Sequence, residues 1–226
     1  EAAVVESFRD SHVSGVMMTA QVIAAALWAG IPIEQSRGHM VVDVGAGVTE
    51  AAVISLSNVV TARKTLAAGD GFDAAIENHI RATHHLLIGQ ATAERVKLEL
   101  SRQSASESGG VIRAKGRCLS QGIPREVSLT ASELIEAMNA PIEQILGAVK
   151  DALSETPPEL SSDLLESGIV LTGGSAHLAA LSARIEESTG LPVRIVSQPQ
   201  HSVILGLAHQ LERLRHRDWR RFGRPL

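Results

Sequence analysis

The chain has 226 residues, of which 44% are hydrophobic and 20% are charged, so it can bury the core of one large or two small domains. Its net charge of −4 gives no general reason to expect a nucleic-acid partner. The single cysteine, Cys118, excludes an internal disulfide framework and fits a reducing compartment, and an aromatic content of 2% argues against base-stacking platforms.

The first predicted element is an alanine-rich helix over residues 16–28, which Gly30 and Pro32 bring to an end. It lies within residues 13–33, a stretch that carries no charged residue and is long enough to cross a membrane. Because this stretch is mostly alanine and contains polar residues and a proline, a helix buried in a packed interior is favoured over a membrane span.

Strands and helices alternate after this point. Three strands that form a meander are predicted over residues 40–44, 51–56 and 59–64. A turn over residues 68–73 leads into a helix, and another helix begins near Gln90.

The next segment is polar and is predicted to hold a loop over residues 101–110 and a hairpin of residues 111–119 and 125–129. The run TASE, residues 130–133, is a capping box that opens a helix. Pro141 is expected to kink or restart that helix.

The last third of the chain holds a strand over residues 168–172, an alanine-rich helix, a strand over residues 193–196 and a helix over residues 203–217. A meander followed by helix, strand and helix predicts an α/β fold with a mixed sheet flanked by helices. The polar region between residues 73 and 129 predicts a small α+β subdomain inserted into that fold.

Two glycine bends follow apolar strands, one after Asp43 and one after Thr172. Glycines let main-chain N–H groups face a ligand, which suits phosphate oxygens, and an Asp at a strand end can hold Mg²⁺ through water. Ligands collect beyond the carboxyl ends of strands in open α/β sheets, so both bends could face one nucleotide. A Gly-x-Gly run also occurs in ordinary tight turns, so the first bend alone leaves that reading open.

Several motifs resemble bacterial actins of the MreB type, which belong to the actin, chaperone and sugar-kinase superfamily. They are MVVDVGAGVTE (residues 40–50), IGQATAERVK (88–97) and LTGGSA (171–176), with PPEL (157–160) and GDGFD (69–73) in agreement. The resemblance runs from about Val16 to the last helix. It implies an actin-like, ribonuclease H-like fold, ATP and Mg²⁺ held between two domains, and filaments that guide cell shape and peptidoglycan synthesis.

The resemblance also implies roles for individual residues. Asp43 would act in catalysis near the metal, and Gln21 would position the attacking water. The nucleotide-binding residues would be Gly45, Ala46, Gly47 and Val48 at the phosphates, Glu94, Arg95, Val96 and Lys97 near ribose and adenine, and Gly173, Gly174, Ser175 and Ala176 over the base. On residues alone, Glu94 and Lys97 could instead be a surface ion pair, and Gln21 could merely satisfy a polar spot.

The chain departs from the family pattern at four points. Gln21 stands where MreB relatives usually have Glu, and Ala46 and Ser175 replace glycines. The family's first phosphate loop is expected to precede Glu1 and is absent from these 226 residues. Because phosphoryl transfer depends on positioning and electrostatics, the chain is expected to be at most a slow ATPase.

The resemblance implies a division into domains. Residues 1–35 and 203–226 would be a remnant of the first actin-like domain, residues 36–72 and 130–202 the second, and residues 73–129 the inserted subdomain. Two alternative functions remain: a non-hydrolysing assembly partner that keeps the interfaces, and a sugar kinase or chaperone ATPase. The latter is disfavoured because the insertion is too small for a substrate domain.

The expected partners are further copies of the chain in a filament and the cell-wall elongation or division machinery, in the cytoplasm. Membrane association is a further expectation, because the basic, aromatic tail over residues 213–224 could touch anionic lipid; a solvated terminus is the alternative. His79, His84 and His85 are expected at the surface, since no Cys or carboxylate pattern completes a metal site.

Overall fold

A five-stranded mixed sheet, in the order β4-β3-β2-β8-β9, forms the centre of the computed structural model, which describes residues 2–8, 15–104, 110–215 and 224–225. The first three strands form the expected antiparallel meander, and β8 and β9 run parallel to β2. The strands are β2 (His39–Val44), β3 (Thr49–Ser55), β4 (Asn58–Thr65), β8 (Ile169–Thr172) and β9 (Val193–Ile195). The mixed α/β sheet predicted from the sequence is confirmed.

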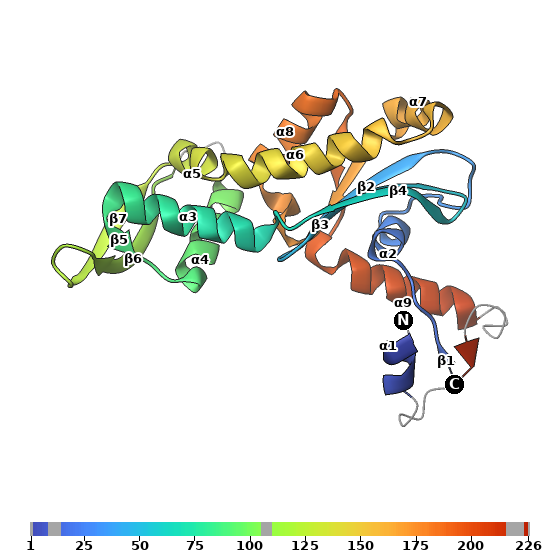
Figure 1. Ribbon diagram of the computed structural model, residues 1–226, viewed down its shortest axis with the longest axis horizontal. Helices are drawn as coiled ribbons and strands as arrows, with labels where there is room; N and C mark the ends of the chain where they lie inside the picture. Colours follow the sequence, from blue (N-terminus) through green and yellow to red (C-terminus); the bar gives the residue numbers. More distant parts are fainter. Residues whose placement is uncertain (1, 9–14, 105–109, 216–223, 226) are drawn as a thin grey trace.

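Side chains alternate along β2 and so enter two separate cores. Met40, Val42 and Val44 face the larger core, whereas Val41 belongs to a smaller core on the other face of the sheet. Helices cover both faces, which explains why β2 reads as a continuous apolar run. The larger core is covered by α6 (Asn139–Ser154), α7 (Pro158–Ser167) and α8 (Ala179–Thr189) (Figure 1).

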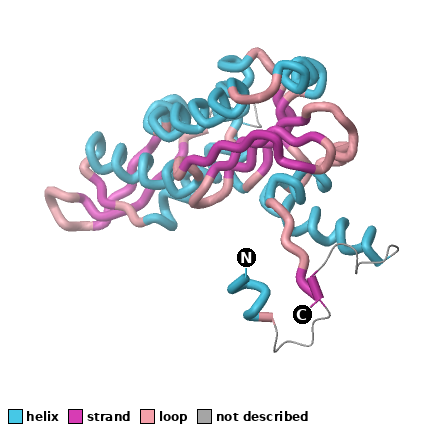
Figure 2. The backbone as a smooth tube through the Cα atoms, turned by 45° about the vertical axis from the view of Figure 1, so that its right-hand side comes forward, coloured by secondary structure: helices cyan, strands magenta, loops and turns pink. Residues whose placement is uncertain are grey.

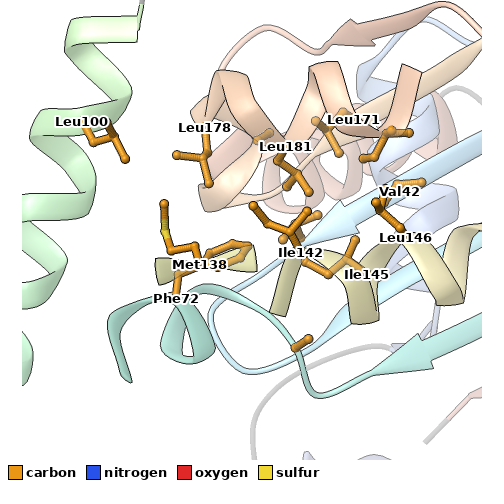
Figure 3. Packing of buried hydrophobic residues seen from close by; sticks show 14 of the residues in the cluster. Val42, Phe72, Leu100, Met138, Ile142, Ile145, Leu146, Leu171, Leu178 and Leu181 are labelled. Atoms are coloured by element: carbon orange, nitrogen blue, oxygen red, sulfur yellow. The ribbon is translucent and has the colours of Figure 1, made fainter. Parts of the chain in front are cut away.

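Figure 3 shows the contact between the sheet and these helices at close range. Ile142 and Ile145 of α6 lie against Leu181 of α8, with Val42 of the sheet beside them. Phe72, the largest fully buried side chain, joins the same cluster from the following helix, α3 (Gly69–His84). The larger core therefore extends from the sheet into the neighbouring subdomain.

The smaller core lies under α2 (Gln21–Trp28), which packs on the sheet and against α9 (Ser202–Arg215). Gly206 allows the two helices to approach closely, because a Cβ at this position would lie 1.8 Å from the carbonyl oxygen of Ala24. Thr19 Oγ1 also donates a hydrogen bond to Gln210 Oε1 at 3.0 Å. No helix of the described residues is long and apolar enough to cross a membrane.

The helix expected over residues 16–28 begins later, at Gln21. Residues 15–16 instead form β1 (Gly15–Val16), which pairs with β10 (Arg224–Pro225), and Ala20 has the extended backbone of a helix N-cap. A short helix, α1 (Ala2–Ser7), precedes β1. Most of the basic tail, residues 216–223, lies outside the described residues.

A smaller α+β unit with its own antiparallel sheet lies at one end of the central sheet (Figure 2). Its antiparallel sheet pairs the expected hairpin in register from Ile112↔Leu129 to Arg117↔Pro124. Its elements are β5 (Leu86–Leu87), α4 (Gln90–Ser104), β6 (Ile112–Cys118), β7 (Pro124–Leu129) and α5 (Ala131–Ala137). Helix α4 continues to Ser104, into the segment expected to be a loop.

Local sequence signals explain the other helix boundaries. The capping box is present: Thr130 Oγ1 accepts a hydrogen bond from the N–H of Glu133, whose carboxylate accepts one from the N–H of Thr130. Helix α5 ends at Ala137 and α6 begins at Asn139, so the helix restarts with Pro141 in its first turn. Helix α7, which the sequence analysis missed, begins at Pro158, a residue well suited to the first helical position. Two 3₁₀ helices, η1 (Gly174–His177) and η2 (Pro199–His201), complete the fold.

Replacing Gly206 with Ala is expected to destabilise the fold by about 1–3 kcal/mol, because the new methyl group pushes α9 away from Ala24. Gly147 in α6 offers a matched control, since a Cβ there meets nothing within 4 Å. Gly147→Ala should stabilise the fold by about 0.5–1 kcal/mol through helix propensity. Urea unfolding of both variants measures the difference, and destabilisation of equal size in both would contradict this account of α2 and α9.

Candidate functional site

The two glycine bends lie side by side because β2 and β8 are adjacent parallel strands, with Asp43 opposite Thr172. A Cβ on Gly173 would lie 2.3 Å from the carbonyl oxygen of Val44 and 2.7 Å from Asp43 Oδ1. Gly173 also has a φ of 90°, a conformation that favours glycine. Both bends therefore sit together at the carboxyl ends of their strands, which is where α/β sheets bind ligands.

A cavity of about 660 Å³ opens beside these bends. Its wall is built from both bends, the first turn of α3 and one side of α4. Its lining includes Gly45, Ala46, Gly174 and Ser175 of the bends, Gly69, Asp70 and Asp73 of α3, and Gln90, Glu94, Lys97 and Ser101 of α4. Four segments that are far apart in the sequence thus share one site.

Helical periodicity decides which residues of α4 face the cavity. Glu94 and Lys97 line it, together with Gln90 and Ser101, because these positions recur every three to four residues. Val96 is instead fully buried in the larger core. Arg95 points to the other side of the helix, where it pairs with Glu99 at 3.7 Å and donates to the carbonyl oxygen of Arg113 at 3.3 Å.

Lys97 is tied to α3 and makes no ion pair with Glu94. Its Nζ lies 2.8 Å from Asp73 Oδ1 and donates to the carbonyl oxygen of Gly69 at 3.0 Å. The side chains of Lys97 and Asp73 are only 12% and 5% exposed. Burial raises the pKa of Asp73, and the hydrogen bond and charge of Lys97 oppose that rise. The pair links the two helices that form the wall of the cavity.

The first bend is held by the start of α3. The carbonyl oxygens of Gly45 and Ala46 accept hydrogen bonds from the N–H groups of Gly69 and Asp70, at 3.0 and 2.8 Å. The N–H groups of Ala46 and Gly47 themselves have no hydrogen-bond partner among the described residues. The bend is therefore fixed through its carbonyl oxygens, while two of its N–H donors are left for a ligand.

Asp43 is half-buried, at the end of β2 beside Gly173. Its carboxylate forms no ion pair with a described lysine or arginine. Burial raises its pKa, and the carboxylate of Glu50, directly opposite on β3, raises it further. Carboxylate oxygens without an internal cation match the ligands that Mg²⁺ prefers, so Asp43 fits the expected metal.

The other predicted site residues do not line the cavity; besides Arg95 and Val96 they are Gln21, Asp43, Gly47, Val48, Gly173 and Ala176. Ala176 is fully buried. Val48 is exposed beyond the first bend, and Gln21 is exposed at the start of α2. Four residues that line the cavity were not predicted from the sequence: Asp70, Asp73, Gln90 and Ser101. Gln90 and Ser101 could have been predicted, because each lies one helical turn from Glu94 or Lys97 on the same face of α4.

Two of the three histidines expected at the surface are partly buried instead. The side chains of His79 and His84 are 25% and 22% exposed, and both contact the carboxylate of Glu133. His85 alone is exposed, with a left-handed backbone at the end of α3. A carboxylate does approach this pair, which the sequence analysis missed because Glu133 is distant in the sequence.

The family model described as MreB/Mbl protein matches residues 1–218. The chain belongs to the MreB/Mbl family. It is 41% identical over 210 residues to the cell shape-determining protein MreB of Escherichia coli K12, covering 93% of this chain and 60% of that protein. It is 35% identical to Mbl of Bacillus subtilis 168, covering 95% of this chain and 64% of that protein. The MreB/Mbl chain thus spans about 60% of the length of the curated relatives that it matches.

Solved structures agree with this assignment. MreB5 of Spiroplasma citri bound to ADP has a TM-score of 0.89 at 30% identity, covering 94% of this chain and 65% of that one. MreB 5 of the same organism bound to AMPPNP has a TM-score of 0.82 at 31% identity, covering 87% of this chain and 59% of that one. The MamK double helical filament, with a TM-score of 0.68 at 21% identity, shows the shared fold. The expected MreB-type actin fold is confirmed.

Lys97→Met should destabilise this MreB/Mbl chain by about 3–5 kcal/mol, because it leaves the buried Asp73 carboxylate without its cation. Arg95→Met on the same helix breaks only the exposed pair with Glu99 and should cost less than about 1 kcal/mol. Urea unfolding of the two variants checks the contrast. The double variant Lys97→Met, Asp73→Asn should regain part of the loss, and similar costs for both single variants would contradict the coupling.

Asp43→Asn should raise the melting temperature of the ligand-free chain at about pH 7, because it removes the charge of a half-buried carboxylate that has no cation of its own. The folded-state pKa of Asp43 is raised, so this group stabilises the fold at low pH and loses that contribution as the pH rises through the raised pKa. The gain should therefore shrink near pH 4, close to the ordinary Asp pKa of about 3.9. Thermal melts at both pH values test this, and a gain that is the same at both would contradict it.

Proposed function

We propose that this chain binds ATP with Mg²⁺ and assembles into filaments that guide cell shape and cell-wall synthesis. The observation that carries the proposal is the convergence of two glycine bends, the start of α3 and one face of α4 on a single cavity. The cavity volume of about 660 Å³ lies in the range of about 300–1,000 Å³ that small-molecule sites occupy. The MreB5 structures with ADP and AMPPNP support a nucleotide as the occupant.

The cavity and the two bends beside it offer groups suited to each part of the nucleotide. The N–H groups of Ala46 and Gly47 would donate to phosphate oxygens, and the Asp43 carboxylate would hold Mg²⁺ through water. Glu94 would accept hydrogen bonds from ribose hydroxyls. Lys97, fixed by Asp73, would position that part of α4. Gly174 and Ser175 would lie over the base. When bound, Mg²⁺ supplies charge neutralisation at the phosphates.

Hydrolysis is proposed to be slow at most. Gln21 would orient water from the start of α2, since an amide can position water but cannot accept a full proton. The non-hydrolysing assembly partner remains the second candidate, and Ser175 favours it. The buried Ser175 hydroxyl lies 3.2 Å from the position a Cβ on Gly69 would occupy, so it fills space at the cavity wall.

Assembly and domain division are parts of the same proposal. The packing of α2 against α9 supports a first domain made from residues 1–35 and 203–226, with 36–72 and 130–202 as the second and 73–129 as the insertion.

Exposed apolar side chains, among them Leu165 of α7 at 70% and Ile204 of α9 at 63%, support contacts with further copies of the chain. The cell-wall elongation or division machinery and the membrane surface are proposed as further contacts.

The decisive experiment places a side chain inside the cavity without disturbing the fold. Gly174 lines the cavity, and a Cβ there meets nothing within 4 Å, so Gly174→Leu extends into the ligand space. Gly89 is equally open but lies outside the cavity lining, so Gly89→Leu is the matched control. Titration with a fluorescent ATP analogue and Mg²⁺ should show affinity at least about tenfold weaker for Gly174→Leu only.

Pelleting and electron microscopy of the same proteins separate the two candidate functions. Filaments that form only with ATP support the nucleotide-driven protein, and filaments that form equally with and without it support the assembly partner. Equal analogue binding by both glycine variants, or no binding by the unchanged chain, would overturn the nucleotide proposal.

A further inference from the structure

We propose that His79, His84 and Glu133 form a binding site for Zn²⁺ in the small subdomain. The Nε2 atoms of His79 and His84 lie 2.8 and 2.5 Å from the same carboxylate oxygen, Glu133 Oε1. The three ligand atoms all lie within 4.8 Å of one another. The two imidazole rings are 6.3 Å apart at 66°, so they approach the carboxylate from different directions.

The ligands come from two helices whose ends are fixed independently of any metal. His79 and His84 lie in the last two turns of α3, and the carbonyl oxygen of His84 accepts a hydrogen bond from Arg125 of β7. Glu133 lies in the first turn of α5, where its Oε2 accepts the N–H of Thr130 in the capping box. One oxygen of Glu133 is thus held by the backbone, and the other is presented to the histidines.

The donor set fits zinc better than magnesium or calcium. Two imidazole nitrogens and one carboxylate oxygen are the ligands of many three-ligand zinc sites, and imidazole is a poor ligand for the hard cations. Tetrahedral ligands about 2.0–2.1 Å from the metal lie about 3.3 Å apart. The two imidazole–carboxylate separations of 2.8 and 2.5 Å need to open by less than about 1 Å, and the two imidazole nitrogens, at most 4.8 Å apart, need to close by at most about 1.5 Å. Rotation of the three side chains is of sufficient range for these shifts.

The carboxylate of Glu133 is largely shielded from solvent, since its side chain is 21% exposed. Three protein ligands leave a fourth position for water. Zn²⁺ at this place would clamp the end of α3 to the start of α5, two helices that are already in contact.

This site is separate from the cavity at the other end of α3. Gly69 and Asp70 begin the helix and line the cavity, whereas His79 and His84 lie near its end. The 16 residues of α3 make a helix about 24 Å long. Zinc binding is therefore tested without nucleotide, and its outcome does not depend on the proposed function.

The test is calorimetric titration of the purified protein with Zn²⁺ alone, together with the absorption spectrum of the Co²⁺ form, which reports tetrahedral coordination. One Zn²⁺ per chain is expected. Glu133→Gln and His84→Gln should each weaken binding more than roughly tenfold, since even loss of a second-sphere partner costs that much. Gln at 133 can still accept the Thr130 N–H, so the helix cap and the fold are retained.

His85→Asn is the matched control, because His85 is exposed, adjacent in sequence and outside the cluster, and Asn tolerates its left-handed backbone. This variant should keep both the stoichiometry and the affinity. If His84→Gln does not fold, as judged by circular dichroism, His79→Gln takes its place. Absence of Zn²⁺ binding, affinity unchanged in Glu133→Gln, or equal loss in His85→Asn would overturn the proposal.

Discussion

The parallel pairing of β2 with β8 is the constraint on which the rest of the site depends. The register that places Asp43 opposite Thr172 brings two bends separated by about 130 residues to one edge of the sheet. The contact is so close that only a glycine fits at position 173, against the Val44 carbonyl. Because both faces of the sheet are covered by helices, this edge is where polar groups can gather beside solvent.

Helix α3 connects this edge to the small subdomain. Its first two N–H groups hold the first bend, and Asp73 one turn later holds Lys97 of α4. Phe72, between these contacts, is fully buried in the larger core. The same turn of helix therefore fixes the bend, orients the facing helix and anchors both to the core. A rigid frame of this kind keeps the N–H donors of Ala46 and Gly47 in place without using them.

Much of this arrangement could be predicted from local sequence signals, because strands, caps and glycine bends are encoded by neighbouring residues. The strands of the meander, the capping box at Thr130 and the adjacency of the bends were all anticipated. Long-range contacts could not be read in this way. The partner of Lys97 proved to be Asp73, on another helix, and Glu133 reaches two histidines while also capping its own helix. Residues 94–97 were predicted as one binding segment, but they lie on a helix. The helical period turns Arg95 and Val96 away from the cavity.

Asp43 and Asp73 are two carboxylates whose pKa values are raised by burial, and they differ in whether the chain supplies a counter-charge. Asp73 is more deeply buried, yet Lys97 supplies its counter-charge from within the chain. Asp43 faces a second carboxylate, Glu50, and Lys64 pairs with Glu50 at 3.3 Å, whereas no described lysine or arginine pairs with Asp43. A half-buried carboxylate without its own counter-ion costs stability, and groups of this kind cluster at functional sites. This contrast supports Asp43 as the proposed ligand of an external cation, whereas Asp73 completes an interaction that the fold already contains.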